Sequence, residues 1–409
     1  AVTDSRTYDG TTSSDGEPVV DPLYDGDEVS LAPIQSFDTK HAGTEKVLSA
    51  SGLLISDGNG GNNYVVSYVD DSTGTIDPLA VTVTAVTDSK TYDGTTVSDG
   101  IPAVDPLMSG DVISVSPIQV FDNKNAGTEK TLSASGLLID DGNGGDNYNV
   151  NYLSVNTGSI DRLGIDVTAV ADSKTYDGST SSVGVPVVDL LMVDDEVAEQ
   201  AKQVFSTKHA GSGKTLVASG LVINDGNEGG NYEVNYVSVN TGNIDPLGIQ
   251  VTAVEDRKTY DGTNASAGVP VVDPLVGEDV VDVTAVQVFD TKHVGSGKAL
   301  IASGLAINDG NGGNNYAVSY VDVHTGAIDQ LGINVRAVSD SKEYDGTVVS
   351  SAQPQVDALM PGDMASVDPA QVFDNRNAGT GKTLTASGLQ IDDSNGGNNY
   401  FVTYVDDHT

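Results

Sequence analysis

The stretch Asp88-Ser89-Lys90-Thr91-Tyr92-Asp93-Gly94 decides the architecture, because close copies of it recur along the chain at one fixed spacing. Its Tyr-Asp-Gly core occurs five times, with the tyrosines at Tyr8, Tyr92, Tyr176, Tyr260 and Tyr344. Each step is 84 residues, and a phenylalanine keeps the same register at Phe37, Phe121, Phe205, Phe289 and Phe373. Repetition at a fixed period, without insertions, predicts a tandem array of one structural unit.

The joints between the units are expected near an Ile-Asp-x-Leu sequence, of which Ile76-Asp77-Pro78-Leu79 is the first. We place the repeats at residues 1–77, 78–161, 162–245, 246–329 and 330–409. The array begins and ends within the same linker region, so we expect the fifth repeat to be C-terminally truncated and the chain to be a piece of a longer one. Only two or three residues separate the strands expected on either side of a joint. Such short joints predict that the modules form an elongated, stiff rod.

Alternation among the copies predicts the strands. In Tyr64-Val65-Val66-Ser67-Tyr68 the first, third and fifth positions are the same in all five copies (Tyr148, Val150 and Tyr152 in the second), whereas the second and fourth vary. A period of two is typical of a strand with one buried face, so both tyrosines of this stretch are expected to be buried. Turns rich in Gly, Asp and Asn separate about six or seven strands in each repeat, and no segment has a helical apolar period. The sequence therefore predicts an all-β chain of five β-sandwich modules, immunoglobulin-like or β-grasp-like.

The composition excludes several classes of partner. The chain has 59 acidic against 19 basic residues, a formal net charge of -40, and no cysteine. Phosphate backbones and anionic membrane surfaces both recruit basic residues, so neither nucleic acid nor a membrane surface is an expected partner. No run of about 18 apolar residues occurs, so we expect no membrane insertion. Calcium binding and a saline habitat would each account for the acidity.

Several motifs in fixed order resemble a known repeat family. They are Val83-Thr84-Ala85-Val86 before the Asp88–Thr96 stretch, the later Asn147-Tyr148-Asn149-Val150, and then Thr157-Gly158-Ser159-Ile160. This combination resembles the YDG-type repeats, related to MBG repeats, of large bacterial secreted adhesins of the filamentous-haemagglutinin kind. The resemblance covers all five copies. It implies an extracellular, mostly-β stalk module at the bacterial cell surface, and it supplies no catalytic residues.

A loop rich in Gly, Asn and Asp is the strongest candidate for a metal site. Calcium favours six to eight oxygen ligands, and an Asp-x-Asn-Gly stretch offers several of them in one turn. The other interpretation is a hairpin loop in which Gly and Asn adopt positive φ. Calcium is the one candidate cofactor, and its candidate ligands are Asp57, Asn59, Asn63, Asp141, Asn143, Asn147, Asp225, Asn227, Asn231, Asp309, Asn311, Asn315, Asp393, Asn395 and Asn399.

Two other recurring residue types have structural and chemical interpretations. The lysine at Lys46 recurs in every copy, either as an exposed side chain on an acidic surface or as one half of a Lys–Asn isopeptide cross-link with the Asn63-type residue. His41, His209 and His293 are replaced by Asn125 and Asn377 in the other two copies, so we expect no metal or acid–base role there. No nucleophile or base recurs beside the Tyr-Asp-Gly turn, so we expect no enzymatic activity.

Three functions remain open at this stage. The leading one is a structural stalk or spacer that projects a distal binding domain, because duplication changes length above all. A self-assembling extracellular filament or biofilm-matrix subunit is the first alternative, and a multivalent glycan-binding repeat is the second. The expected partners are the neighbouring repeats, other copies of the chain, and a host or matrix ligand reached through domains outside it.

Overall fold

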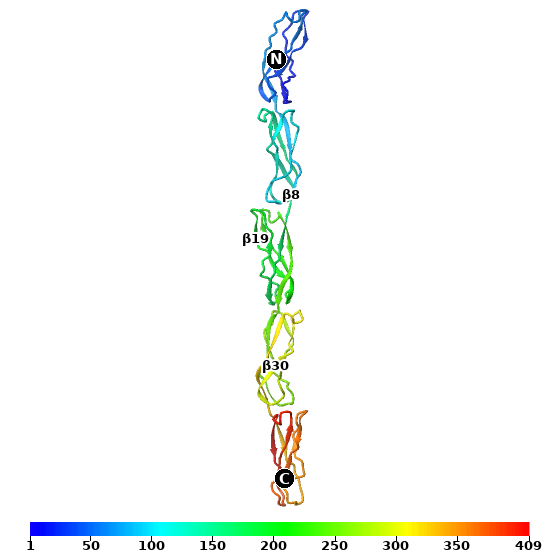
Figure 1. Cartoon of the computed structure of the whole chain (residues 1–409), viewed down its shortest axis with the longest axis vertical. Helices are drawn as coiled ribbons and strands as arrows, with labels where there is room; N and C mark the ends of the chain where they lie inside the picture. The colour runs from blue at the N-terminus through cyan, green and yellow to red at the C-terminus, as the bar shows by residue number, and fades with distance from the viewer. Residues whose placement is uncertain (409) are drawn as a thin grey trace. The chain divides into compact units, whose positions relative to one another are not determined.

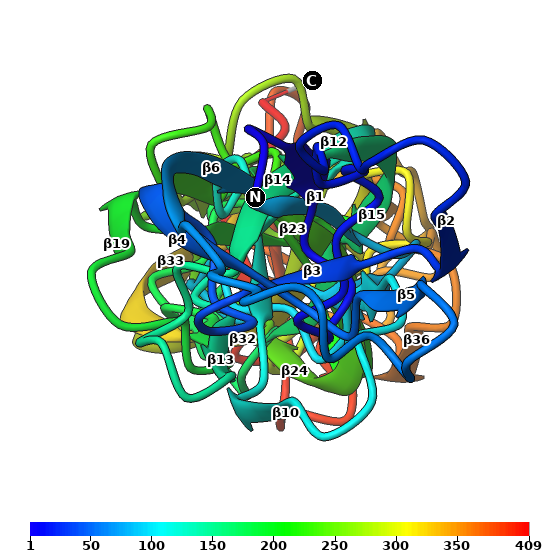
Figure 2. The same ribbon diagram turned by 90° about the horizontal axis from the view of Figure 1, so that it is seen from above.

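The computed structural model describes residues 1–408, so Thr409, which we placed in the fifth repeat, lies outside the described residues. All regular structure in the described part of the chain is β-strand, as Figures 1 and 2 show. The described residues contain no helix that is long and apolar enough to cross a membrane. The expected all-β chain of five modules is confirmed.

The second module shows the complete arrangement. Its strands are β7 (Leu79–Thr84), β8 (Ser89–Thr91), β9 (Ala103–Val104), β10 (Val112–Val115), β11 (Ile118–Phe121), β12 (Gly127–Ser135), β13 (Leu138–Asp140), β14 (Tyr148–Leu153) and β15 (Val155–Asp161). They form a four-stranded sheet in the order β11-β12-β15-β8, a three-stranded sheet β14-β7-β9 and a two-stranded sheet β10-β13. The module thus has nine strands rather than six or seven, because several strands are only two to four residues long.

The third and fourth modules repeat this pattern, and the first and fifth contain part of it. The first contains β1 (Ser5–Thr7), β2 (Glu28–Leu31), β3 (Ile34–Phe37), β4 (Gly43–Ser51), β5 (Leu54–Ser56) and β6 (Asp71–Asp77). The third contains β16 (Leu163–Thr168), β17 (Ser173–Thr175), β18 (Val187–Val188), β19 (Glu196–Glu199), β20 (Lys202–Phe205), β21 (Gly211–Ser219), β22 (Val222–Asn224), β23 (Tyr232–Val237) and β24 (Val239–Asp245). The fourth contains β25 (Leu247–Thr252), β26 (Arg257–Thr259), β27 (Val271–Val272), β28 (Val280–Val283), β29 (Val286–Phe289), β30 (Gly295–Ser303), β31 (Ala306–Asn308), β32 (Tyr316–Val321) and β33 (Val323–Asp329). The fifth contains β34 (Leu331–Arg336), β35 (Gln355–Val356), β36 (Met364–Val367), β37 (Ala370–Phe373), β38 (Leu384–Ser387), β39 (Gln390–Asp392) and β40 (Tyr400–Val405).

The two larger sheets of a module share one core. In the second module, Val83 and Tyr148 from the three-stranded sheet pack in the same buried cluster as Phe121, Leu132 and Ile160 from the four-stranded sheet. This is the layering of a β-sandwich, in which inner faces interdigitate. The two-stranded sheet lies apart: in the first module, β2 and β5 lie to one side of β1, β3, β4 and β6 (Figure 2).

Parallel pairing links the ends of each module. Strand β14 pairs with β7 in parallel from Tyr148 opposite Leu79 to Leu153 opposite Thr84. Strand β15 pairs in parallel with β8 and antiparallel with β12, so it lies inside the four-stranded sheet. A single residue, Arg162, then separates β15 from β16 of the next module, where two or three had been expected. One nearly continuous extended segment therefore serves as an inner strand in two successive modules.

The chain divides into two compact units, and the division falls inside the third module. One unit comprises residues 1–168, 187–201 and 219–237, and the other comprises 169–186, 202–218 and the described residues from 238 onward. The first two joints between successive modules lie wholly within the first unit, and the last two lie wholly within the second.

The predicted burial of β14 is half right. Tyr148 is buried, but Tyr152 is 43% exposed, and its four equivalents Tyr68, Tyr236, Tyr320 and Tyr404 are similarly exposed. Burial decreases along the strand, and at its far end the Tyr152 hydroxyl accepts a hydrogen bond from the Leu137 N–H (2.9 Å). The ring is therefore held on the surface by a backbone contact, and the expectation that both tyrosines are buried is wrong.

Gly158 in β15 tests how tightly the four-stranded sheet packs. A Cβ atom there would lie 2.9 Å from Phe121 Cε1 and 3.0 Å from the Lys130 carbonyl oxygen, whereas one at Gly164 in β16 would meet nothing within 4 Å. We expect Gly158→Val to destabilise the second module by about 1–3 kcal/mol, because a packed core does not accept the added volume. Gly164→Val is the matched control and should be nearly neutral, since the equivalent position in β7 already holds Ala80.

The measurement is amide hydrogen exchange in the full chain, followed in residues 118–135. Faster exchange for Gly158→Val alone is the expected result. Equal protection in both variants would contradict the packing described here.

Candidate functional site

Each joint between modules is built around one buried aspartate. At the first joint this residue is Asp111, which closes a turn with its N–H bonded to the Met108 carbonyl just before β10. Its side chain is 1% exposed. One of its carboxylate oxygens, Oδ2, accepts hydrogen bonds from the hydroxyl of Tyr8 (2.9 Å) in the first module and from that of Tyr148 (2.7 Å) in the second. A single carboxylate thereby satisfies phenols from two modules.

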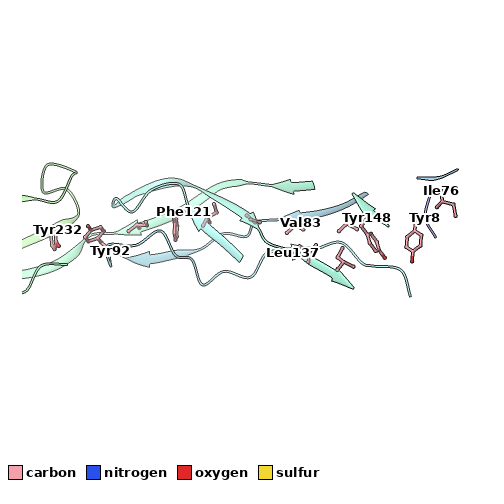
Figure 3. Packing of buried hydrophobic residues seen from close by; sticks show 14 of the residues in the cluster. Tyr8, Ile76, Val83, Tyr92, Phe121, Leu137, Tyr148 and Tyr232 are labelled. Carbon is pink, nitrogen blue, oxygen red and sulfur yellow. The ribbon is translucent and has the colours of Figure 1, made fainter. Parts of the chain in front are cut away.

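The aromatic rings and a lysine complete this cluster. Tyr8 and Tyr148 lie next to one another (Figure 3). Their rings meet edge to face with centroids 5.6 Å apart, and such pairs add to the free energy of apolar burial. The Lys40 ammonium lies 3.5 Å from Asp111 Oδ1 and 5.8 Å from the centroid of the Tyr8 ring. The buried carboxylate is thus neutralised by a cation that the first module supplies, which offsets its desolvation.

A second contact crosses the joint through a backbone amide. The Ala42 N–H of the first module donates to Asn147 Oδ1 of the second, at 2.8 Å. Asn147 is fully buried, and its Nδ2 lies 3.3 Å from His41 Nδ1. This contact ties the turn before β4 to the loop before β14, so each joint is held at two places.

The same Tyr–Asp–Tyr group occurs at all four joints, and Lys40, Lys124 and Lys292 lie beside the aspartate at the first, second and fourth of them. The aspartate accepts both tyrosine hydroxyls at 2.7–2.9 Å in each case. The triplets, in chain order, are Tyr8–Asp111–Tyr148, Tyr92–Asp195–Tyr232, Tyr176–Asp279–Tyr316 and Tyr260–Asp363–Tyr400. The amide contact also recurs, with Ala126, Ala210 and Val294 donating to Asn231, Asn315 and Asn399. The fifth copy of the first tyrosine, Tyr344, is 67% exposed.

Burial and the neighbouring carboxylate keep the joint tyrosines protonated. Burial, followed by the hydrogen bond to Asp363, raises the pKa of Tyr260 to about 12. The same two causes raise the pKa of Tyr148 and of Tyr232 well above the usual value for a phenol. These hydroxyls are therefore donors to the joint carboxylate throughout the physiological range of pH.

The loop that we singled out for calcium lies at the joint. Asp141 Oδ1 accepts the N–H groups of Asn143 and Gly145, and Oδ2 accepts that of Asn147. The Asn143 amide also donates to Asn147 Oδ1 at 3.0 Å. Burial alone would raise the pKa of the Asp141 carboxyl, but these backbone hydrogen bonds outweigh it and lower the pKa.

The structure thus brings the three candidate ligands of each loop together through hydrogen bonds. The same bonds recur in the other four copies, which are Asp57, Asn59 and Asn63; Asp225, Asn227 and Asn231; Asp309, Asn311 and Asn315; and Asp393, Asn395 and Asn399. Lone pairs that calcium would use are occupied by these bonds. Among residues 1–408, no group of three His, Asp or Glu side chains is placed to hold a metal ion. Calcium binding at these loops stays a prediction.

The recurring lysine has a different position from either interpretation. Lys130 is 7% exposed in its side chain, pairs with Asp122 at 3.1 Å and contacts Asn123. The interpretation as an exposed lysine is therefore wrong for this copy, and Lys46 and Lys298 are buried in the same way. Asn147, the partner considered for a cross-link, instead contacts its own loop and the preceding module.

The joint aspartate is the functional residue that sequence reasoning missed. Asp27, Asp111, Asp195, Asp279 and Asp363 are invariant among the five copies, and the position of Lys40 is cationic in all of them, ending in Arg376. This recurring basic side chain in a strongly acidic chain was the feature of the sequence that could have indicated a buried acidic partner. The histidine position also belongs to the joint, where Asn125 accepts from Asn231 in the place of His41.

Comparison with known proteins agrees with the repeat. The family model for the YDG domain matches residues 1–73, 77–157, 162–240, 245–323 and 330–407. No curated protein matches the sequence.

Two solved structures show a remote likeness. The protocadherin GammaB4 extracellular domain has 9% identity over 95% of this chain and 80% of its own, with a TM-score of 0.18. The eight N-terminal Ig domains of Down Syndrome Cell Adhesion Molecule have 11% identity over 95% of this chain and 66% of their own, with a TM-score of 0.16. At such TM-scores, neither likeness carries an argument about fold or function.

Removal of one joint hydroxyl tests the cluster. Tyr92→Phe leaves Asp195 without one of its two phenol donors, and we expect the second joint to lose ~1.5–3 kcal/mol, the usual range for a hydrogen bond to a charged group. The reporter is exchange of the Ala126 amide, whose N–H is bonded across this joint. It should exchange about 10- to 100-fold faster. Tyr344→Phe is the control and should leave this amide unchanged. Unaltered exchange in Tyr92→Phe would show that the hydroxyl does not hold the joint.

Proposed function

The chain belongs to the YDG domain family, and from this membership we propose that it is the stalk or spacer of an extracellular bacterial adhesin or surface fibre. In this role it projects a distal binding domain away from the cell. The observation that supports the proposal most strongly is the recurrence of one buried Tyr–Asp–Tyr cluster at four successive joints. A spacer has to resist bending where its modules meet, and these clusters lie there.

Two features of each joint favour stiffness. A single residue connects the strands on its two sides, so the linker has little freedom of its own. If the first two modules separated, the buried Asp111 would lose the Tyr8 hydroxyl and the Lys40 ammonium and keep only the Tyr148 hydroxyl of its own module. The free-energy cost of this loss opposes bending at the joint. In an array in which each module contacts only its neighbours, every joint adds the same constraint. The spacer would therefore lengthen in proportion to the number of modules.

We also propose that the chain is not an enzyme and that it acts outside the cell. The polar groups that recur most strictly, such as Asp111 and Asp141, are hydrogen-bonded to phenols and backbone amides that have structural roles. Its partners under this proposal are the neighbouring modules and, through other domains, a surface ligand. The acidic surface keeps the stalk away from anionic polymers.

Specific observations favour each of the two alternatives. Exposed apolar side chains gather on β10, β11 and β13, where Val112, Ile118 and Leu138 are each more than half exposed, and such patches favour lateral assembly into a filament. The net charge of -40 opposes that assembly unless salt or cations screen it. The Tyr152-type rings provide more aromatic surface for a glycan than the sequence had indicated.

The height to which the chain raises an epitope above a polymer brush tests the proposed stalk function. The full chain is anchored at its C-terminus to a surface that carries a polymer brush, with a small epitope at its N-terminus. A second version carries the whole chain twice in tandem. We expect the doubled chain to expose its epitope above brushes that hide the single chain, because stiff modules add length.

Disruption of all four joints by Tyr8→Phe, Tyr92→Phe, Tyr176→Phe and Tyr260→Phe should shorten the reach of both versions. Equal reach for the single and doubled chains would contradict a spacer. Light scattering over a concentration series, in EDTA and in calcium, is the control for lateral assembly, and growth with concentration would favour the filament instead.

A further inference from the structure

The strands at the two ends of a module both lie inside sheets. In the second module these strands are β7, which follows the first joint, and β15, which precedes the second. Strand β7 lies between β14 and β9, and β15 lies between β12 and β8. A single residue, Pro78, separates β6 from β7, and Arg162 alone separates β15 from β16. A pulling force along the chain would therefore pass between these modules through extended backbone, with no slack linker.

The direction of strand pairing decides how the second module would resist that force. Strand β7 runs parallel to β14, and six residues of each strand pair without a break. At one end of this ladder the Leu79 N–H donates to the Asn147 carbonyl at 2.9 Å. At the other end the Ala85 N–H donates to the Leu153 carbonyl, also at 2.9 Å. Because β14 continues into β15 after one residue, tension would draw β7 and β14 in opposite directions along their length. The ladder between them would thus be loaded in shear.

A second parallel pair opposes the same movement. Strand β8, which follows β7 in the chain, pairs in parallel with β15 from Ser89 opposite Ser159 to Thr91 opposite Asp161. On its other side β15 pairs with β12 in the antiparallel direction. Strand β15 would therefore have to slide past two neighbours before the second module could lengthen.

Side-chain contacts also fix the register of β7. Val81 and Val83 are almost completely buried in the core. A slide of one residue would turn both side chains to the other face of the sheet. Between them, the Thr82 N–H donates to the Asp105 carboxylate at 2.9 Å, and the Asp105 N–H donates to the Thr82 carbonyl at 3.0 Å. Packing and hydrogen bonds therefore oppose sliding on both sides of β7.

The same strand pairs recur in the later modules. Strands β16 and β23, β25 and β32, and β34 and β40 each pair in parallel over six residues, as β7 and β14 do. The second parallel pair recurs as β17 with β24 and as β26 with β33. The chain thus contains a series of equivalent ladders with the same direction and register.

We propose that the modules have a further function as tension-bearing links, whose parallel strand pairs resist pulling along the chain by shear. The hydrogen bonds of a ladder loaded in shear share the force and have to break together, whereas a ladder peeled from one end breaks one bond at a time. The even spacing of bonds in a parallel pair suits this sharing. The proposal concerns tension along the chain, and it does not rest on the role of the chain as a stalk.

Pulling one strand pair in two directions tests the proposal. The chain has no cysteine, so the handles of an optical trap can be attached to the full chain at introduced cysteines. Ala80→Cys with Ser154→Cys places the handles at opposite ends of the β7–β14 pair and loads it in shear. Ala80→Cys with Asn149→Cys is the matched control, because Asn149 lies opposite Ala80 and force applied there peels the pair apart. All three positions are exposed.

We expect the second module to unfold at a several-fold larger force in the shear variant than in the peeling variant, at the same loading rate. The two variants load the same ladder from different directions, so the direction of the force is what the comparison changes. Equal unfolding forces in the two variants would overturn the proposal.

Pulling the chain through its two termini provides the second measurement. One repeat of 84 residues has an extended length of ~280–300 Å, from which the length of the folded module is subtracted. We expect unfolding steps of this size at forces close to that of the shear variant. Steps at the low force of the peeling variant would show that tension along the chain does not load the ladders in shear, and would also overturn the proposal. The brush experiment is made without tension, so the two proposals can fail separately.

Discussion

The carboxylate shared by two tyrosines at each joint is the interaction on which the arrangement of successive modules depends. A buried aspartate is costly unless it is paired, and the preceding module supplies Asp111 with the Tyr8 hydroxyl and the Lys40 ammonium beside the Tyr148 hydroxyl of its own module. Contact between the modules thus satisfies a charge that separation would leave buried or force into water. The geometry is also directional, since two phenol donors and one cation approach one carboxylate from fixed elements.

The first module differs from the others in the surroundings of its Asn63 loop. Asn63 there is exposed, whereas its equivalents in the other four modules are fully buried against the preceding module. Residues 64–69 belong to no strand, so the strand predicted at Tyr64-Val65-Val66-Ser67-Tyr68 is wrong for the first copy, whereas its equivalents form β14, β23, β32 and β40. The loop itself keeps its shape, because Asp57 still accepts the same three backbone N–H groups. The loop is therefore held in shape by its own hydrogen bonds. In the second module the joint adds the contact of Asn147 with Ala42, and β7 pairs with the strand that follows the loop.

Much of the fold could be predicted from the sequence, because the five copies reveal which positions tolerate change. Invariant Tyr148 and Val150 between variable Asn149 and Asn151 predicted the strand β14 and the burial of Tyr148 correctly. The same pattern could not separate Tyr148 from Tyr152, because both point to one face and only tertiary contacts decide how far that face is covered. Asp111 was overlooked for a related reason: one invariant aspartate among 59 acidic residues carries no sign of burial. The loop of Asp141 was recognised as a site, but its contact with Ala42 lies 105 residues away in the chain, and no local pattern reveals it.

The central claim is that each joint holds its two modules in one orientation, and a distance distribution across one joint tests it most directly. The chain has no cysteine, so spin labels can be attached at Ser49→Cys in β4 and Ser114→Cys in β10, both of which are exposed. Pulsed electron–electron resonance on the full chain should then give a single narrow distribution. That distribution should broaden when Asp111→Ala removes the shared carboxylate. A broad distribution in the parent chain, or one that Asp111→Ala leaves unchanged, would contradict the account.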